Sequence, residues 1–216
     1  SIIICGWYSE KKLYRMILFI LKGAYIVAWL LFAITSRTNE TSLSRHQENG
    51  GMLMNMGFIG AGKVGFSLGK YLTERKETVT GYYSRSPHTA QEAAEFTDTR
   101  QYLSMKDLAE DSDALFLTVP DGAIVSVWEQ LKMLPIQNKL IIHCSGAMSS
   151  AVFSDIGRCH AYGYSIHPLL AVNDKYNSYQ ELSGAFFTIE GDERYLAELK
   201  AMFEGFGNTV ETICAR

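Results

Sequence analysis

Three glycines at positions 60, 62 and 65 form a GxGxxG pattern whose spacing suits the binding of a phosphate group. An apolar run precedes the pattern and helical spacing follows it, as in a strand–turn–helix unit. In such a unit the first glycine permits the tight turn, the second lets a pyrophosphate approach the backbone, and the third lets helix and strand pack closely. The helix N-terminus then offers unpaired N–H groups. The alternative is a turn in which the glycines are incidental. We expect a dinucleotide to bind along Gly60, Ala61, Gly62, Lys63, Val64 and Gly65.

The end of the next strand indicates which dinucleotide binds. The segment "TVTGYY" has the pattern of a strand and is followed by Ser84, Arg85 and Ser86. An NAD-binding unit usually places an acidic residue here to hold the ribose 2′-hydroxyl group. Two hydroxyl groups and a guanidinium instead suit a 2′-phosphate, through charge-assisted hydrogen bonds. The sequence thus predicts NADP as the cofactor, with a solvated turn arginine as the alternative interpretation.

Two later strand ends carry further candidates, because ligands of open α/β sheets lie outside the carboxyl ends of the strands. Val119, Pro120 and Asp121 follow the apolar run "ALFLT". This loop either lies along the nicotinamide half of the cofactor or serves only to cap the next helix through Asp121. Ser145 and Gly146 follow the run "KLIIHC". There a hydroxyl group and a backbone N–H could meet a substrate carbonyl or the nicotinamide amide.

A histidine before a proline supplies the first candidate for proton transfer. His167 stands in the run "SIHPLL", and a residue held before proline is biased toward extended geometry, so we expect it beyond a strand end and projecting into the crevice. Hydride transfer to a carbonyl or imine needs a proton donor, and imidazole titrates near neutrality. We predict His167 and Ser145 as catalytic residues; for His167 a structural or substrate-positioning role is the alternative. We expect His143 to pack inside a strand, and Ser149 or Ser150 to cap a helix.

The elements that position these residues alternate along the chain from residue 54 onward. Short apolar runs are separated by stretches of helical spacing at residues 63–75, 89–96, 122–134 and 193–206. Strands that alternate with helices indicate βαβ units and a mostly parallel sheet. Ser104 is a candidate N-cap, and Asp107 three residues later supports it. The pattern predicts a doubly wound α/β domain with a Rossmann sheet.

Composition excludes several classes of function. The chain has 216 residues, a net charge of −3 and no block of basic residues, so no nucleic-acid partner is expected. The four cysteines show no CxxC pair, and no His, Asp or Glu cluster has metal-ligand spacing, so we predict reduced thiols in a cytoplasmic protein and no metal site.

The first 53 residues differ from the rest. Residues 16–34 are apolar enough to span a bilayer and follow Lys11, Lys12 and Arg15, as in a signal anchor. Such an anchor would place the phosphate loop outside the cell, away from NADP. We therefore interpret residues 1–53 as an upstream extension read through in frame, with the native start at Met54 or a neighbouring methionine. A protein anchored to the membrane through residues 16–34 is the alternative.

Six motifs in order resemble one known family. They are "GFIGAGKVGFSLGKYL", "GYYSRSP", "TVPDGAI", "HCSGAMSS", "GYSIHPLLA" and "FFTIEGDE", and together they resemble the Rossmann-like NADP oxidoreductases with an uncharacterised C-terminal helical domain. Those proteins are relatives of pyrroline-5-carboxylate reductase and prephenate dehydrogenase. The resemblance covers about residues 54–213. It implies an NADP-binding domain at residues 54–216 and a helical domain, missing here, that dimerises and closes the active site.

These observations favour an NADP-dependent oxidoreductase that transfers a hydride between the cofactor and a small carbonyl or imine substrate. A non-catalytic NADP-binding sensor or regulatory module is the alternative, because it needs the same loop. On the resemblance, we expect the full-length protein to be the enzyme, this fragment to be inactive, and a homodimer to require the helical domain.

A chain that begins at Met54 is expected to be soluble without detergent and as stable as the full chain. The first strand begins within a residue or two of Met54, so the sheet needs nothing upstream, whereas residues 16–34 have no amphipathic period with which to pack on a core. Size-exclusion chromatography and thermal unfolding of both chains test this. A misfolded Met54 chain beside a well-behaved full chain would show that the N-terminal segment belongs to the fold.

Overall fold

A computed structural model describes residues 54–214 of the chain. The predicted extension, residues 1–53, and the apolar segment at residues 16–34 lie outside the described residues. Within residues 54–214, no helix is both long enough and apolar enough to cross a membrane.

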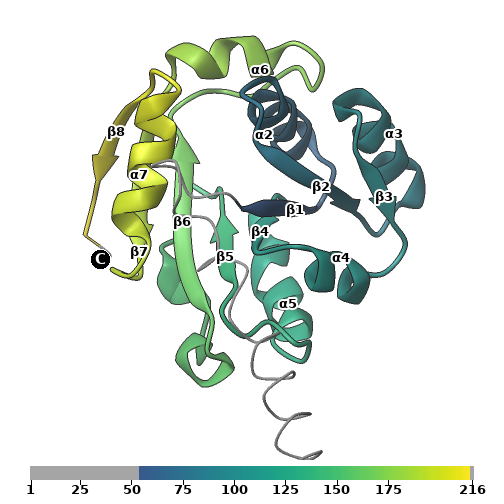
Figure 1. The fold of residues 1–216 in the computed structure, drawn as a ribbon, viewed down its shortest axis with the longest axis vertical. Coiled ribbons are helices and arrows are strands. Elements are labelled where there is room, and N and C mark those ends of the chain that lie inside the picture. The colour runs from purple at the N-terminus through teal and green to yellow at the C-terminus, as the bar shows by residue number, and fades with distance from the viewer. Residues whose placement is uncertain (1–53, 215–216) are drawn as a thin grey trace, which may run out of the picture. The chain divides into compact units, whose positions relative to one another are not determined.

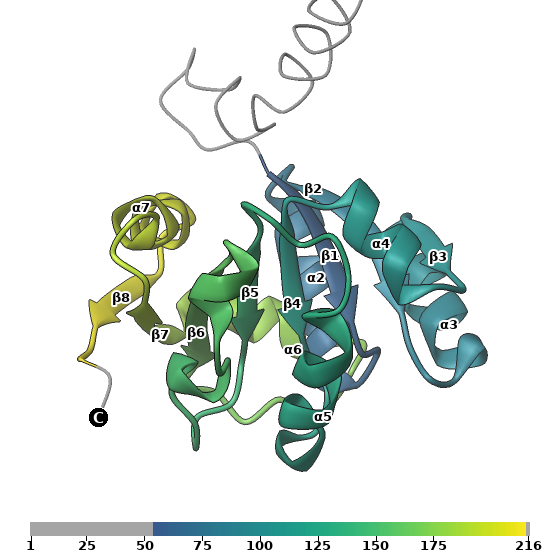
Figure 2. The same ribbon diagram turned by 90° about the horizontal axis from the view of Figure 1, so that it is seen from below.

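Eight strands of the described region form one sheet in the order β3-β2-β1-β4-β5-β6-β7-β8. Neighbouring strands are parallel except for β6 and β7, which are antiparallel. Figure 2 shows β3 and β8 at opposite ends of the sheet. The predicted doubly wound α/β fold is confirmed. The strands are β1 (Asn55–Ile59), β2 (Thr78–Tyr83), β3 (Arg100–Tyr102), β4 (Ala114–Leu117), β5 (Leu140–His143), β6 (Tyr162–Pro168), β7 (Phe186–Gly191) and β8 (Thr209–Thr212).

The strand order reverses between β1 and β4, and this reversal decides where a ligand can bind. Both strands are parallel and lie side by side, while the chain leaves β1 toward β2 and leaves β4 toward β5. The two connections therefore diverge at the carboxyl ends and leave a crevice between them. The GxGxxG turn follows β1, so the fold places it at this crevice.

Helices cover both faces of the sheet (Figure 1). On one face lie α2 (Lys63–Glu74), α3 (Pro87–Thr97), α6 (Ser178–Glu181) and α7 (Leu196–Gly205), and the 3-10 turn η4 (Leu182–Gly184) packs against α2. On the other lie α4 (Met105–Asp111), α5 (Asp121–Leu131) and the 3-10 turns η2 (Ser150–Val152) and η3 (Ile156–Cys159). Ser104 is the N-cap of α4 and accepts a hydrogen bond of 3.4 Å from the backbone N–H of Asp107, as predicted.

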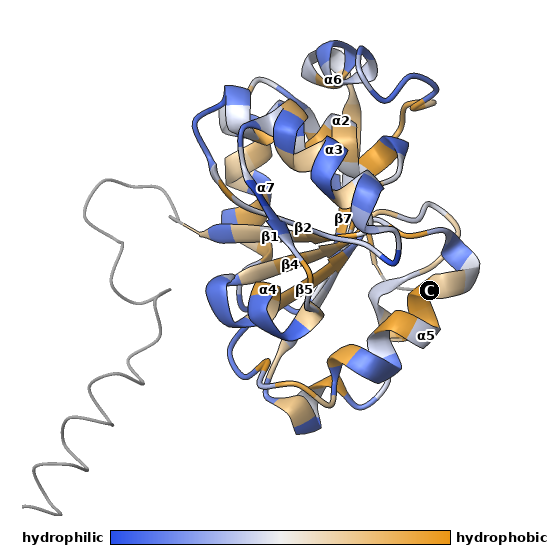
Figure 3. Ribbon diagram, turned by 90° about the vertical axis from the view of Figure 1, so that its right-hand side faces the viewer, coloured by the Kyte–Doolittle hydropathy of each residue, from blue (hydrophilic) through white to orange (hydrophobic). Residues whose placement is uncertain are grey.

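The apolar side chains of the strands form a core on each face of the sheet. On the face of α2, the rings of Tyr82, Phe58 and Phe116 stack in a row with centroids 5.1 Å apart. On the face of α5, the fully buried Trp128 packs against Phe153, and its indole N–H donates to the carbonyl of Ser154 at 3.0 Å. Figure 3 shows the hydrophobic colours gathered on the central strands and the hydrophilic ones on the outer sides of the helices. Both faces of the sheet are therefore buried, as a mostly parallel sheet requires.

A buried asparagine joins three distant parts of the chain. Asn208, just before β8, accepts a hydrogen bond from the Tyr71 hydroxyl on α2. Its side-chain amide donates to the carbonyls of Leu182 at 2.7 Å and Ala185 at 3.1 Å, on the connection between α6 and β7. Asn208 therefore fixes this connection against α2.

Replacing Asn208 by alanine is expected to lower the free energy of unfolding by about 1–3 kcal/mol, because one hydroxyl and two carbonyls lose their buried partner. Urea unfolding of the variant measures this loss. The exposed Asn177, which bonds only the nearby Asp174 carboxylate through its side chain, is the control, and its alanine variant should change stability by less than about 0.5 kcal/mol. Equal effects for the two variants would contradict the role given to Asn208.

Candidate functional site

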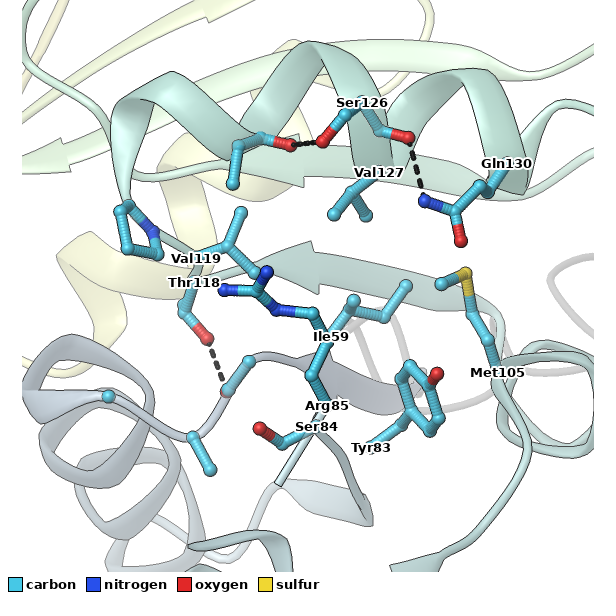
Figure 4. Close-up of a pocket in the computed structure, with 15 residues that line it drawn as sticks. Ile59, Tyr83, Ser84, Arg85, Met105, Thr118, Val119, Ser126, Val127 and Gln130 are labelled. Atoms are coloured by element: carbon cyan, nitrogen blue, oxygen red, sulfur yellow. Dashed lines mark hydrogen bonds between the residues drawn. The ribbon is translucent and has the colours of Figure 1, made fainter. Parts of the chain in front are cut away.

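A cavity of about 240 Å³ lies at the carboxyl ends of β1, β2 and β4. Figure 4 shows its lining, with the Arg85 side chain extending toward the side formed by Thr118 and Val119. The turn after β1, the end of β2, the end of β4 and one side of α5 enclose it, together with the first residue of α4. The lining residues are Ile59, Gly60, Ala61, Gly62, Tyr83, Ser84, Arg85, Met105, Thr118, Val119, Pro120, Ala123, Ser126, Val127 and Gln130.

The turn after β1 is held against β4 by contacts that only glycine allows. Gly60 has a φ of +108° and donates its N–H to the Tyr83 carbonyl at 2.8 Å. The Thr118 hydroxyl donates to the Gly60 carbonyl at 2.8 Å. A Cβ at Gly65 would lie 2.6 Å from the Thr118 hydroxyl oxygen and 2.7 Å from the Gly60 carbonyl oxygen. Helix α2 therefore packs against this strand end at a distance that excludes any side chain at position 65.

Gly62 differs from its two neighbours in the pattern. It is the exposed N-cap of α2, in extended conformation, and a Cβ there would meet no protein atom closer than 3.8 Å. The space next to Gly62, at the N-terminus of α2 and bordering the cavity, is therefore free of protein atoms. The first N–H groups of a helix have no acceptor within the helix, so they can bind an anion placed here. Ala61 and Gly62 line the cavity, while Lys63, Val64 and Gly65 form the first turn of α2.

The end of β2 presents hydroxyl groups and a guanidinium at the cavity. Ser84 and Arg85 line it, whereas Ser86 is the N-cap of α3 outside the lining. The Ser84 hydroxyl oxygen accepts hydrogen bonds from the Thr89 hydroxyl at 3.2 Å and from the Ser86 N–H at 3.4 Å. These bonds fix the Ser84 oxygen beside the N-terminus of α3. The structure thus brings Ser84 and Arg85 to the cavity and leaves Ser86 at its edge.

The end of β4 contributes Val119 and Pro120 to the cavity but not Asp121. Pro120 occupies the N-cap position of α5, and Asp121 is the first helical residue, with no side-chain capping bond at the N-cap. The alternative in which Asp121 caps the helix is therefore wrong, because Pro120 holds the N-cap position. Its carboxylate lies in the first turn, where a negative charge is favourable to the helix dipole.

The two predicted catalytic residues lie together at the ends of β5 and β6, outside the lining of the 240 Å³ cavity. The sequence predicted His167 beyond the end of a strand. The structure instead places it inside β6. The reason is that β6 pairs with the antiparallel β7, which extends it: His167 is opposite Thr188. The ring Nδ1 of His167 lies 3.0 Å from the Cys144 carbonyl oxygen. A Cβ at Gly146 would lie 2.5 Å from the ring Nε2.

His143, Ser145 and His167 form a second cluster beside the cavity. His143 and the turn that follows it form the buried side of this cluster. His143 is fully buried at the end of β5, and its Nδ1 accepts the Ser145 N–H at 3.2 Å. Burial lowers the pKa of His143, although the Ser149 backbone and the carboxylate of Glu190 oppose this. Burial also raises the pKa of the Cys144 thiol to about 12, so this thiol stays protonated at neutral pH.

The expected serine caps are replaced by a bond to a carboxylate from a distant strand. Ser149 is the N-cap of η2 without a side-chain bond, so its predicted capping bond is not formed. Ser150 donates both its N–H and its hydroxyl, the latter at 2.8 Å, to the carboxylate of Glu190 on β7. Because β5, β6 and β7 are in register, His143, Ser165 and Glu190 form a buried polar row across the sheet.

Residues 43–168 match the family model of the Rossmann-like domain, which is more than half of the chain. The chain belongs to the Rossmann-like domain family. No curated protein matches the chain.

Solved structures share the architecture of this Rossmann-like domain. A protein from Thermotoga maritima is 27% identical with a TM-score of 0.55, over 73% of this chain and 56% of that one. A candidate NADP oxidoreductase from Bacteroides fragilis is 19% identical with a TM-score of 0.63, over 74% and 59%. A reductive aminase from Aspergillus terreus, in complex with NADPH and ethyl 5-oxohexanoate, is 12% identical with a TM-score of 0.58, over 75% and 55%. The chain therefore spans less than two thirds of the length of each.

Several residues that line the cavity, and the buried Glu190, were not predicted from the sequence. Met105, Ser126 and Gln130 reach the cavity from helices, where their spacing is that of ordinary helix positions. Thr118 directly precedes the predicted loop at Val119, and its place at the end of an apolar strand could have marked it. Glu190 is charged yet buried, which only the fold reveals. Within residues 54–214, no group of three or more His, Cys, Asp or Glu side chains could hold a metal ion.

Replacing Gly65 by alanine is expected to lower the free energy of unfolding by about 1–3 kcal/mol, because the new methyl overlaps the Thr118 hydroxyl and the Gly60 carbonyl. The matched variant Gly62→Ala meets open space and should cost less than Gly65→Ala, because its penalty is only that alanine is a poorer N-cap than glycine. Urea unfolding of both variants gives the comparison. If Gly65→Ala were as stable as Gly62→Ala, the close packing between α2 and β4 would not constrain the turn.

Proposed function

We propose that this domain binds NADP(H) as part of an oxidoreductase that acts on a small carbonyl or imine substrate. The observation that supports the proposal is the geometry of the glycine turn: the N-terminus of α2 borders a cavity at the reversal of strand order, and no protein atom fills the space beside Gly62. A dinucleotide is the ligand class that such a site fits. The similarity to a reductive aminase in complex with NADPH and a keto ester supports the same class of chemistry.

The residues present fit a dinucleotide with a 2′-phosphate. Ala61 and Gly62 would hold the pyrophosphate with backbone N–H groups, aided by the first turn of α2, and Gly60, whose own N–H is bonded to the Tyr83 carbonyl, would shape the turn. Ser84 and Arg85 would hold the 2′-phosphate, because both line the cavity and supply a hydroxyl and a guanidinium from the end of β2. Among the described residues 54–214, no acidic side chain lines the cavity to receive a ribose 2′-hydroxyl instead. NADP is therefore the proposed cofactor.

The chemistry divides between the cofactor and the chain. The cofactor, when bound, supplies or accepts the hydride. The chain itself orients the two reactants and transfers the proton. We assign this proton transfer to His167, which lies beside Ser145 at the ends of β5 and β6. These strands follow β4 in the sheet, so their carboxyl ends lie next to the loop at Val119 and Pro120 on the same edge.

A non-catalytic NADP-binding module is the second candidate. The observation that favours it is that Ser145 and His167 are outside the lining of the cavity. The two candidates differ in whether hydride transfer is detected when NADPH and carbonyl substrates are supplied to the full-length protein. Both need the same dinucleotide site.

We expect the domain to bind NADPH more tightly than NADH, and Arg85→Ala to remove most of this preference. Loss of a charge-assisted bond to the 2′-phosphate costs about 1.5–3 kcal/mol, which corresponds to about 10- to 150-fold in Kd for NADPH. NADH affinity should change little. Isothermal titration with both dinucleotides measures the four constants.

Two control variants make the titration specific. Arg158→Ala removes an exposed arginine on η3 that pairs only with the nearby Asp155 carboxylate, and it should leave both affinities unchanged. Gly62→Val should abolish binding of both dinucleotides while the domain stays folded, because its side chain would fill the space above the helix N-terminus. An NADH preference that Arg85→Ala leaves unchanged would overturn the assignment of NADP, and unchanged binding by a folded Gly62→Val variant would overturn the site.

A further inference from the structure

The cavity of about 240 Å³ has a lining that the phosphate groups of a dinucleotide do not use. This part of the lining includes Ile59, Tyr83, Met105 and Val127, whose side chains are largely apolar. Figure 4 shows Val127 on the side of α5, with Ile59 and Tyr83 on the side of β1 and β2. Sites that enclose a drug-sized ligand measure about 300–1,000 Å³, so this smaller cavity suits one part of a dinucleotide. A flat group with two apolar faces fits between these walls.

The side-chain amide of Gln130 is oriented at the cavity by the backbone of its own helix. Its Nε2 donates a hydrogen bond to the Ser126 carbonyl at 3.0 Å. A carbonyl oxygen only accepts, so the nitrogen must be the amide atom that faces it. Figure 4 shows the amide oxygen of Gln130 turned away from α5, on the side of Met105. Gln130 therefore presents a hydrogen-bond acceptor, Oε1, at the cavity that it lines.

The Ser126 side chain, about one helical turn before Gln130, presents an acceptor as well. Its hydroxyl group donates to the Ala123 carbonyl at 2.9 Å, so its proton is bound to the backbone of α5 and its oxygen can accept. Both residues line the cavity. A ligand that meets this side of α5 must therefore bring hydrogen-bond donors.

We propose that the part of the cavity beside α5 binds the purine base of the dinucleotide, and that Gln130 selects adenine by accepting a hydrogen bond from its exocyclic amino group. This rests on the proposed binding of NADP(H). The faces of the base pack between Val127 and the side chains of Ile59 and Tyr83. A purine with an oxo group in place of the amino group would bring a second acceptor against Oε1, so no hydrogen bond would form there. Glutamine pairs with the same amino group of adenine when proteins read nucleic-acid bases.

Isothermal titration of the full chain with NADP⁺ and with its deaminated analogue, in which hypoxanthine replaces adenine, tests the role of Gln130. Loss of one neutral hydrogen bond should make the analogue bind about three- to tenfold more weakly than NADP⁺. Gln130→Leu should remove this preference by lowering the affinity for NADP⁺. Equal affinities of the wild type for the two dinucleotides would overturn the proposal, and so would a preference that Gln130→Leu leaves unchanged.

Gln180→Leu is the matched control for this substitution. Gln180 is exposed on α6, its side chain donates to the neighbouring Tyr179 hydroxyl, and it is outside the cavity lining. This variant should keep the preference of the wild type. Its loss in Gln180→Leu would show that the preference does not come from Gln130 and would overturn the proposal.

A second pair of variants tests where the base lies. Val127→Phe fills the space between α5 and the ends of β1 and β2, so it should weaken the binding of both dinucleotides about tenfold or more, a change of about 1.4 kcal/mol. Val125→Phe is the control, because Val125 is 49% exposed on the same helix and is outside the cavity lining. Circular dichroism shows whether each variant is folded. Unchanged NADP⁺ affinity in a folded Val127→Phe variant would overturn the placement of the base, and the comparison of the two dinucleotides on the wild type needs neither variant.

The same titrations separate this inference from the proposed function. If the wild type binds neither dinucleotide, the proposed function fails and the base site fails with it. If the wild type binds NADP⁺ and Arg85→Ala weakens that binding, while the two bases bind equally well, the proposed function stands and only the present inference fails.

Discussion

The contact between the turn after β1 and the end of β4 is the constraint on which the rest of the domain depends. The Thr118 hydroxyl reaches the Gly60 carbonyl at 2.8 Å, and Gly65 brings α2 against the same two groups. A backbone that must pass so close to its neighbour admits no side chain at positions 60 and 65. The third glycine is free of this constraint, since nothing in the protein occupies the space above Gly62. Packing within the described part of the protein therefore does not require glycine at position 62.

In the half of the sheet formed by β5, β6 and β7, several polar groups are buried. Burying a carboxylate is costly unless hydrogen bonds replace its water. Glu190 meets this condition because Ser150 supplies two hydrogen-bond donors. These two bonds hold the start of η2 against β6 and β7. The antiparallel β7 is what brings Glu190 into line with His143. The start of η2 is thus held by a residue 40 positions farther along the chain.

Local patterns in the sequence were sufficient for the fold and for the glycine turn after β1, but not for the cluster of His143, Ser145 and His167. The glycine spacing, the apolar runs and the Ser104 cap each report on contacts within a few residues, and the structure has them where expected. The placement of His167 beyond a strand end was wrong because its strand is extended by pairing with a segment more than 20 residues away. Met105 and Gln130 reach the cavity only after α4 and α5 have packed on the sheet. The roles assigned to Arg85, Ser145 and His167 stay predictions.

The two histidines of the second cluster show how the environment divides roles between identical side chains. His143 is fully buried, its Nδ1 accepts a backbone N–H, and burial lowers its pKa. A neutral ring bonded in this way carries its proton on Nε2, inside the protein, and can only shape the turn. His167 has the opposite arrangement, because its Nδ1 donates to a carbonyl, which leaves the lone pair of the neutral ring on Nε2, and Gly146 packs over the face of the ring. One turn thus donates an N–H to the first ring and accepts from the second, and both tautomers follow from which backbone group each Nδ1 meets.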